Sequence, residues 1–277
     1  MVLGASDEQS RSWLLRSSHR VDWILRTFGL PVVLVVTSVG RLMKPQDRII
    51  VALDVPTRAE AFHFIDDLEG LVSFYKVGLE LLLGGGLQDL SGHLAGKQVF
   101  VDLKLPDDIP ATVGNVVRVA AEAGAKFLTL SHSVGPATLR AAVRGRGAHR
   151  LPELLWVPVL SSMDSSDFAA QTGGKPEDFH ADVVRRAKSV AAAGADGFIV
   201  SGQEIAVLRA EFPNVPLVSP GIRPAWAPAD DHKRACTPAE AIRLGADYIV
   251  VGRPIRNAGN RDARRAAAQR IIDEIAL

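Results

Sequence analysis

The segment 98–132 reads QVFVDLKLPDDIPATVGNVVRVAAEAGAKFLTLSH and contains the unit from which the fold can be predicted. It begins with a short apolar run at 98–104, passes through a polar loop into a helical stretch at 112–123, and returns to an apolar run at 126–132. Gly124 follows the helical stretch directly, as is common where helices end. Strand, helix and strand in this order predict parallel strands.

The same pattern recurs on both sides of this segment, from Arg48 onward. The six further apolar runs are RIIVALD (48–54), FYKVG (74–78), LLWVPVL (154–160), GFIVS (197–201), PLVSPG (216–221) and YIVVGR (248–253). Other helical candidates are 178–193, 238–244 and 261–275. Eight such units in about 230 residues favour a closed barrel over an open doubly wound sheet, and no G-x-G-x-x-G follows the first run. We therefore predict an α/β fold, a single-domain (β/α)8 TIM barrel over 43–277.

Composition limits the class of protein and its partners. The 277 residues are 47% hydrophobic and 23% charged, a balance typical of globular chains. Lys and Arg number 32 against 31 Asp and Glu, so no global basic field exists to hold nucleic acid or an anionic membrane. The single cysteine, Cys236, excludes an internal disulfide and a Cys-rich zinc site, so we expect a cytoplasmic protein. The longest apolar run, 30–36, is too short to span a membrane.

The first 42 residues differ in charge from the rest of the chain. They contain five arginines against Asp7, Glu8 and Asp22, and the remainder of the chain is slightly acidic. A cationic stretch before an apolar run is faintly similar to a secretory signal, but no small-x-small cleavage site follows. We predict that 1–42 is a short N-terminal extension that is dispensable, or upstream sequence ahead of a start at Met43.

Polar residues end several of the predicted strands. Asp54 ends the run 48–54, Lys76 lies in 74–78, and His132 ends 126–132. Active sites of (β/α)8 barrels lie at the carboxyl ends of the strands, so these side chains are expected on one rim. Taken singly, each has a plainer explanation as a helix cap, a solvated side chain or a hydrogen-bonded structural residue. Their convergence favours a functional site.

Asp102 and Lys104 are two residues apart in a predicted strand, so both side chains lie on one face. A structural ion pair would explain this spacing alone. Asp107 and Asp108 follow in the next loop, however, and a second carboxylate near one lysine is costly unless function requires it.

Glycine and arginine close the last two predicted strands, as GIR at 221–223 and VGR at 251–253. Glycine there allows backbone N–H groups to approach a phosphate, and arginine binds its oxygens through a bidentate fork. Ordinary turn glycines are the alternative. Two such sites on adjacent strands, where barrels often bind phosphate, favour a phosphate site.

These residues resemble the bacterial-type orotidine 5'-phosphate decarboxylase family, over essentially all of 43–277. The segments that carry the resemblance are MKPQDRIIVALDV, KVGLEL, VDLKLPDDIPATV, PVLSSM, SPGIRP, DHKRACTP and DYIVVGRPI. A D-x-K motif alone would be weak, because sugar-phosphate lyases of the same superfamily share it. The combination with LSSM, GIRP and VGRPI is specific.

The resemblance implies conversion of orotidine 5'-monophosphate to uridine 5'-monophosphate in pyrimidine biosynthesis, without metal or cofactor. It implies that Lys104 donates a proton to C6 and that Asp102 lies against the departing carboxylate. Asp54 and Lys76 would hold the ribose and the charge network. The other implied substrate-binding residues are Ser161 and Ser162 at the pyrimidine and Arg223, Gly252 and Arg253 at the phosphate. His132 and Pro220, at strand ends, are further substrate-binding candidates.

The family's Asp-Ile-Pro segment crosses a dimer interface, so the resemblance also implies a homodimer with composite active sites. Asp108, Ile109 and Thr112 would complete the site of the neighbouring subunit. Here the D-x-K-x-x-D-I-x-x-T pattern contains one residue too many. Counting from Lys104 selects Asp107 as the second catalytic carboxylate, whereas register with Ile109 and Thr112 selects Asp108. We favour Asp108, with the extra residue absorbed in the loop.

A second departure from the family is His232, which stands where a glutamine commonly bridges pyrimidine and phosphate. Two other functions remain open at this stage. One is a magnesium-dependent sugar-phosphate lyase of the same superfamily, such as a hexulose-phosphate synthase. The other is a noncatalytic paralogue that binds a nucleotide.

Overall fold

The computed structural model describes residues 43–84, 93–202, 204–228 and 235–276. Arg41–Leu277 forms one compact unit. The predicted extension at 1–42 lies outside the described residues, and its dispensability stays a prediction. No helix in the described ranges is long and apolar enough to cross a membrane.

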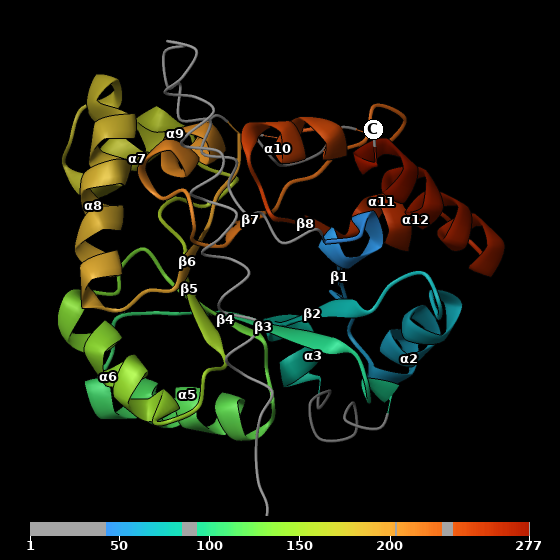
Figure 1. Ribbon diagram of the computed structural model, residues 1–277, viewed down its shortest axis with the longest axis horizontal. Coiled ribbons are helices and arrows are strands. Elements are labelled where there is room, and N and C mark those ends of the chain that lie inside the picture. The colour runs from blue at the N-terminus through green and yellow to red at the C-terminus, as the bar shows by residue number, and fades with distance from the viewer. Residues whose placement is uncertain (1–42, 85–92, 203, 229–234, 277) are drawn as a thin grey trace, which may run out of the picture. The chain divides into compact units, whose positions relative to one another are not determined.

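Eight parallel strands close into a barrel in sequence order, with β8 paired to β1 (Figure 1). The strands are β1 (Ile49–Ala52), β2 (Phe74–Gly78), β3 (Gln98–Leu105), β4 (Phe127–Leu130), β5 (Glu153–Trp156), β6 (Gly197–Ile199), β7 (Leu217–Ser219) and β8 (Tyr248–Val251). Each lies within, or within one residue of, a predicted run. The (β/α)8 TIM barrel is confirmed.

Helices follow the strands and surround the barrel (Figure 1). They are η1 (Pro45–Arg48), α2 (Arg58–Asp67), α3 (Leu79–Leu83), α5 (Pro110–Glu122), α6 (Pro136–Arg146), α7 (Ser165–Thr172), η2 (Pro176–Asp178), α8 (Phe179–Ala193), α9 (Glu204–Glu211), α10 (Pro238–Leu244), α11 (Arg253–Arg256) and α12 (Arg261–Ile275). The bounds of α10 and α12 agree with the prediction. The helix predicted at 112–123 begins earlier, at Pro110, because proline is well suited to the first turn of a helix.

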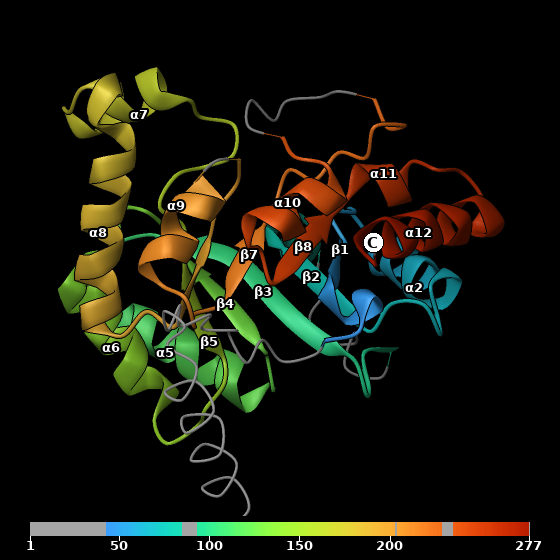
Figure 2. The same ribbon diagram turned by 45° about the horizontal axis from the view of Figure 1, so that its top comes forward.

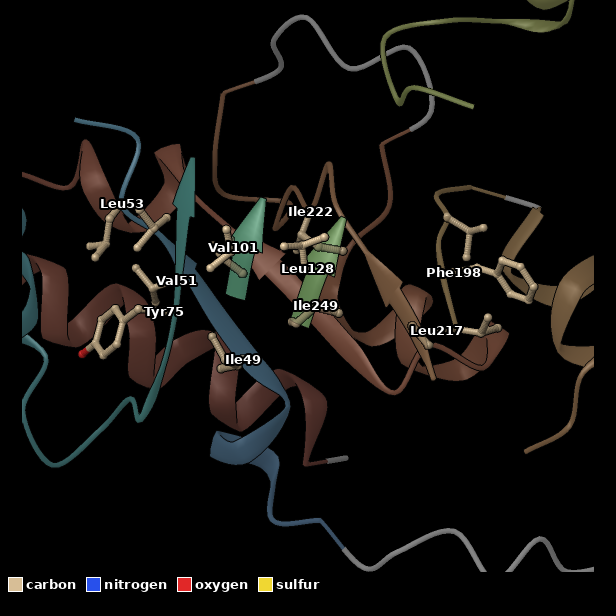
Figure 3. Packing of buried hydrophobic residues seen from close by; sticks show 14 of the residues in the cluster. Ile49, Val51, Leu53, Tyr75, Val101, Leu128, Phe198, Leu217, Ile222 and Ile249 are labelled. Atoms are coloured by element: carbon tan, nitrogen blue, oxygen red, sulfur yellow. The ribbon is translucent and has the colours of Figure 1, made fainter. Parts of the chain in front are cut away.

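The strands are buried on both faces and divide the core into two clusters. Alternate residues such as Ile49, Val51 and Ile249 face the helices and form the larger cluster (Figure 3). The residues between them, such as Ile50 and Val250, belong to a smaller cluster inside the barrel. A period of two between inward and outward side chains is the geometry of a strand.

Four aromatic rings fill the lower part of the barrel interior. Phe127 packs against Phe74, Phe100 and Tyr248 with ring centroids 5.4, 5.9 and 5.3 Å apart. Two residues further along each inward face, Phe74 is followed by Lys76, Phe100 by Asp102 and Phe127 by Thr129. Inside the barrel, the layer of aromatic rings is therefore followed directly by a layer of polar side chains.

Helices α5 and α6 lie side by side in both views (Figures 1 and 2) and make the most extensive helix contact in the described chain. Glycines permit their close approach. A Cβ at Gly145 would stand 2.0 Å from the carbonyl oxygen of Gly114, a distance that requires the backbones to separate. The two glycines therefore allow the backbones of α5 and α6 to lie close together.

Candidate active site

A cavity of about 410 Å³ opens at the carboxyl ends of the barrel strands. It contains ten of the residues predicted from the sequence, drawn from strand ends around the barrel. They are Asp54, Lys76, Asp102, Lys104, Ser161, Ser162, Pro220, Arg223, Gly252 and Arg253. The rule that barrel enzymes place function at this rim therefore identified side chains that share one space.

Four charges of alternating sign form a chain on one side of the cavity. The Nζ of Lys76 lies 2.8 Å from Oδ1 of Asp54 and 3.3 Å from Oδ2 of Asp102. The Nζ of Lys104 lies 2.9 Å from both carboxylate oxygens of Asp102. The inner pair is well buried, since the side chains of Lys76 and Asp102 are each 10% exposed. Lys104, at 42%, is open to the cavity mouth.

The network holds its inner members in their charged forms. Burial is the largest effect on Lys76 and acts to lower its pKa, but the carboxylates of Asp102 and Asp54 outweigh it and the pKa lies above its ordinary value. Burial likewise acts to raise the pKa of Asp102, and the ammonium groups of Lys76 and Lys104 outweigh it, so this pKa is lowered. At neutral pH the two buried groups form an ion pair.

Lys104 has an unusual backbone conformation. Its φ of 45° is the only left-handed value at a non-glycine residue in the described chain, and the β3–β4 register shifts between Val101 and Leu105. The N–H of Lys104 donates to Oγ1 of Thr129 at 2.8 Å, and that hydroxyl donates to Asp102 at 2.8 Å. This register shift is a β-bulge, and it places the side chain of Lys104 against Asp102. Such local strain is typical of functional sites.

Sequence reasoning missed Thr129, although its inward position two residues after Phe127 was a readable signal. It also missed Arg256, which lines the cavity and donates from Nη1 to the backbone carbonyl of Asp54. Arg256 lies three residues after Arg253 in α11 and brings a further cation to the cavity.

The wall of the cavity beside the charge network is apolar. Sequence reasoning did not identify these residues, which are Ala52, Phe100, Val157, Val159, Leu160, Ile199 and Val250. Ser161 and Ser162 follow them at the rim. A flat ring with polar edges would match such a surface.

The glycine–arginine segments line the cavity at the ends of β7 and β8. Gly221 has a φ of 72°, which favours glycine, and the N–H of Arg223 donates to the carbonyl of Cys236 at 2.8 Å. That bond and the bridge between Ile222 and Cys236 fix the course of the GIR segment. Arg223 and Arg253 line the same cavity, which gives it a cationic end.

Five other predicted residues are described but do not line this cavity. Asp107, Asp108, Ile109 and Thr112 are exposed in the loop after β3 and at the start of α5, and Ile109 is 66% exposed. An exposed isoleucine beside two carboxylates is a surface on which a second chain could pack. His232, at the position of the family's glutamine, lies outside the described residues.

His132 lies in the turn after β4, and both of its ring nitrogens contact polar side chains. Its Nδ1 is 3.3 Å from Oγ of Ser131, and its Nε2 is 3.0 Å from Nε2 of Gln171. Partial burial, with a smaller effect from Arg186, lowers the pKa of His132. These contacts correspond to the hydrogen-bonded structural role weighed for this residue.

The barrel, with its chain of alternating lysines and aspartates and a cationic end to its cavity, has the architecture of a (β/α)8-barrel enzyme. Residues 47–271 match the family model described as Orotidine 5'-phosphate decarboxylase / HUMPS family. The chain is 45% identical over 238 residues to an orotidine 5'-phosphate decarboxylase of Rhodopseudomonas palustris (strain BisA53), covering 84% of this chain and 96% of the relative. It belongs to the orotidine 5'-phosphate decarboxylase / HUMPS family.

Further relatives agree with this assignment. An orotidine 5'-phosphate decarboxylase of Anaeromyxobacter dehalogenans (strain 2CP-1) is 46% identical over 233 residues, covering 83% of this chain and 98% of the relative. The crystal structure of orotidine 5'-phosphate decarboxylase from Lactobacillus acidophilus matches with a TM-score of 0.69 at 32% identity, covering 83% of this chain and all of that one.

Proposed function

We propose that the chain decarboxylates orotidine 5'-monophosphate to uridine 5'-monophosphate in de novo pyrimidine biosynthesis. One observation carries the proposal: the Asp54–Lys76–Asp102–Lys104 chain, whose inner pair is buried, lines the cavity of a protein 45% identical to an orotidine 5'-phosphate decarboxylase over 96% of that relative's length. The names of these relatives support decarboxylation over a magnesium-dependent sugar-phosphate lyase or a noncatalytic nucleotide-binding paralogue. We expect the activity in the cytoplasm.

In the proposed reaction, the bond from C6 to the carboxylate breaks and its electron pair stays at C6, which then takes a proton from Nζ of Lys104. Asp102 lies beside the departing carboxylate. Two like charges about 4 Å apart repel by roughly 4 kcal/mol at an effective dielectric of 20, and this repulsion disappears as carbon dioxide leaves. The site is then more complementary to the transition state than to bound substrate.

The rest of the cavity supports binding of the nucleotide. Arg223, Gly252 and Arg253 would bind the phosphate at the cationic end, with Arg256 as a further cation there. Ser161 and Ser162 would contact the edge of the pyrimidine, whose faces fit the apolar wall closed by Pro220. Asp54 and Lys76 would contact the ribose. Binding of the remote phosphate supplies energy that is used at the reacting carbon.

We further propose a homodimer in which Asp108, Ile109 and Thr112 complete the partner's site. The local contacts of the two neighbouring aspartates support Asp108 as the shared one. The N–H of Asp107 donates to Oγ of Ser133 at 3.1 Å, so its backbone is tied to a turn of its own barrel. Among the described residues, the carboxylate of Asp108 accepts one local bond, from the N–H of Ile109 at 2.6 Å, and Asp108 is exposed.

The loss of orotidylate absorbance on mixing with enzyme tests the activity directly. We expect full turnover in excess chelator, because the proposed chemistry uses only side chains. The absence of any change in absorbance would refute the proposed function. A requirement for added magnesium would favour the lyase instead.

Mixed dimers test the composite site. Lys104→Ala and Asp108→Ala are each expected to be inactive, and exchange of their subunits should restore part of the activity because heterodimers contain one site free of both changes. No recovery after demonstrated subunit exchange would refute a shared site that uses Asp108. Recovery with Asp107→Ala, and not with Asp108→Ala, would instead assign the shared carboxylate to Asp107.

A further inference from the structure

Arg186 of α8 carries a charge in an apolar setting that the proposed chemistry does not use. Its guanidinium lies over the rings of Trp156 in β5 and Phe168 in α7, with its central carbon 5.4 and 5.6 Å from their centroids. Burial lowers the pKa of Arg186. A guanidinium placed there loses hydration, so the contacts that it does make must compensate.

The guanidinium makes one hydrogen bond to the barrel. Its Nη2 donates to the backbone carbonyl of His132 at 2.6 Å. Its buried Nη1 has no hydrogen-bond partner among the described residues. The charge is therefore directed at a single main-chain atom, in the turn that joins β4 to α6.

That turn is bonded in two places to the strand and loop that carry the charged residues. The N–H of Ser131 donates to the carbonyl of Leu105, at the end of β3, at 2.9 Å. Oγ of Ser133 accepts the N–H of Asp107 at 3.1 Å. A continuous path thus leads from Arg186 through the turn 131–133 to the backbone beside Asp108.

We propose that Arg186 is a positioning residue, which fixes the 131–133 turn and through Ser133 holds the loop that presents the second catalytic carboxylate. The inference rests on the proposed decarboxylation. It also gives His132 a role through its main-chain carbonyl, in place of the direct substrate contact predicted from the sequence.

A purely structural alternative is that Arg186 packs α8 against the barrel and does nothing to the loop. Arg186→Met separates the two, because it keeps an unbranched apolar stem over Trp156 and removes the donor. Arg185→Met is the matched control. It removes the same charge from the adjacent position of α8, where Arg185 is 71% exposed and pairs with Asp182.

Turnover of orotidylate by wild type, Arg186→Met, Ser133→Ala and the double variant tests the path. We expect each single change to lower kcat about ten-fold or more, since misplacement of a catalytic group by an ångström can cost about a hundred-fold. KM should change less than about two-fold, because the phosphate and pyrimidine contacts are untouched. The double variant should be no slower than the slower single variant, because both changes break one path.

Several results would overturn the inference. Multiplication of the two single effects in the double variant would show that Arg186 and Ser133 act independently. A lower unfolding temperature with unchanged kcat would leave Arg186 only the packing role, as would an equal effect of Arg185→Met. If wild type has no turnover, the proposed function fails and this inference fails with it. If Arg186→Met does not fold, Arg186→Lys replaces it in the comparison of single and double variants, because lysine cannot reproduce the planar guanidinium.

Mixed dimers give a sharper readout, because the loop is proposed to serve the partner's site. In a heterodimer of Arg186→Met with Lys104→Ala, the one live site belongs to the Arg186→Met subunit and receives its loop from a subunit with intact Arg186. We expect that site to turn over at the wild-type rate. A rate as low as that of the Arg186→Met homodimer, with recovery in the Lys104→Ala and Asp108→Ala reference mixture, would overturn the inference. If the reference mixture does not regain activity, the composite site is wrong. The comparison of the two single variants with the double variant then decides the role of Arg186.

Discussion

Asp102→Asn is the substitution for which the structure gives the clearest stability prediction. It keeps the shape of the side chain and removes a charge that lies 3.3 Å from Nζ of Lys76 and 2.9 Å from Nζ of Lys104. Lys104 is 42% exposed and regains water. Lys76 is 10% exposed and is left with Asp54, whose own side chain is 40% exposed. The cost therefore falls on Lys76.

Removal of one partner from a buried ion pair typically costs about 3–5 kcal/mol, because the other charge is left uncompensated. Since Asp54 still contacts Lys76 at 2.8 Å, we expect the lower end, about 3 kcal/mol. For a chain of this size, each 1 kcal/mol lowers the unfolding midpoint by about 2–4 °C. The expected decrease in Tm is thus about 6–12 °C.

Urea and thermal unfolding of wild type and Asp102→Asn measure this difference, with Glu122→Gln as the matched control. Glu122 pairs with Arg118 on the surface, where loss of an ion pair costs about 1 kcal/mol or less. Lys76→Met in the Asp102→Asn background should restore part of the stability, because it removes the stranded charge. A loss for Asp102→Asn no larger than that for Glu122→Gln would refute the reasoning.

The pH dependence of the same difference follows from the two shifted pKa values. The folded pKa of Asp102 is lowered, so its contribution is present above its ordinary pKa of 3.8 and is lost as pH falls through the lower folded value. The folded pKa of Lys76 is raised, so its contribution is present below 10.5 and is lost as pH rises through the higher folded value. The destabilisation by Asp102→Asn should therefore be constant between about pH 5 and 9.

Other parts of the structure give four further predictions. Lys104→Ala should abolish turnover in the absorbance assay, and Lys104→Gly should be about 1 kcal/mol more stable to urea than Lys104→Ala because glycine adopts a φ of 45° without strain. Equal stabilities would argue against the left-handed conformation. A chain that starts at Met43 should have unchanged kcat and KM, and a large loss would show that 1–42 contributes to the folded enzyme. Gly145→Ala should lower the free energy of unfolding by about 1–3 kcal/mol, because its Cβ meets the backbone of Gly114; an unchanged urea midpoint would contradict this.

The strands could be predicted from sequence because a parallel barrel buries both of their faces. Short apolar runs bounded by glycine or polar residues then correspond directly to buried strands. The predicted ends of the strands were less accurate where the apolar pattern continued beyond the last residue paired with a neighbouring strand. The run 154–160 stays apolar, but β5 ends at Trp156, and Pro158 two residues later has no N–H to donate to a neighbouring strand.

The site could be predicted only as far as strand periodicity reaches. A period of two correctly placed Asp102 and Lys104 on one face, yet it gave no sign of the bulge between them and β4. That bulge depends on the hydroxyl of Thr129 in the neighbouring strand, which accepts a hydrogen bond from the N–H of Lys104. Arg186 contacts a turn 54 residues away in sequence, a relation that no local pattern contains.

The two layers inside the barrel explain why the charges alternate. Aromatic rings below Lys76 and Asp102 give them no water from that side, so each buried charge must be neutralised by a neighbour in the same layer. Two aspartates and two lysines in alternation achieve this with no net charge. A substrate carboxylate placed beside Asp102 would then add an uncompensated negative charge to this network. Its departure as neutral carbon dioxide restores the balance, and the same arrangement that stabilises the empty barrel would thereby favour decarboxylation.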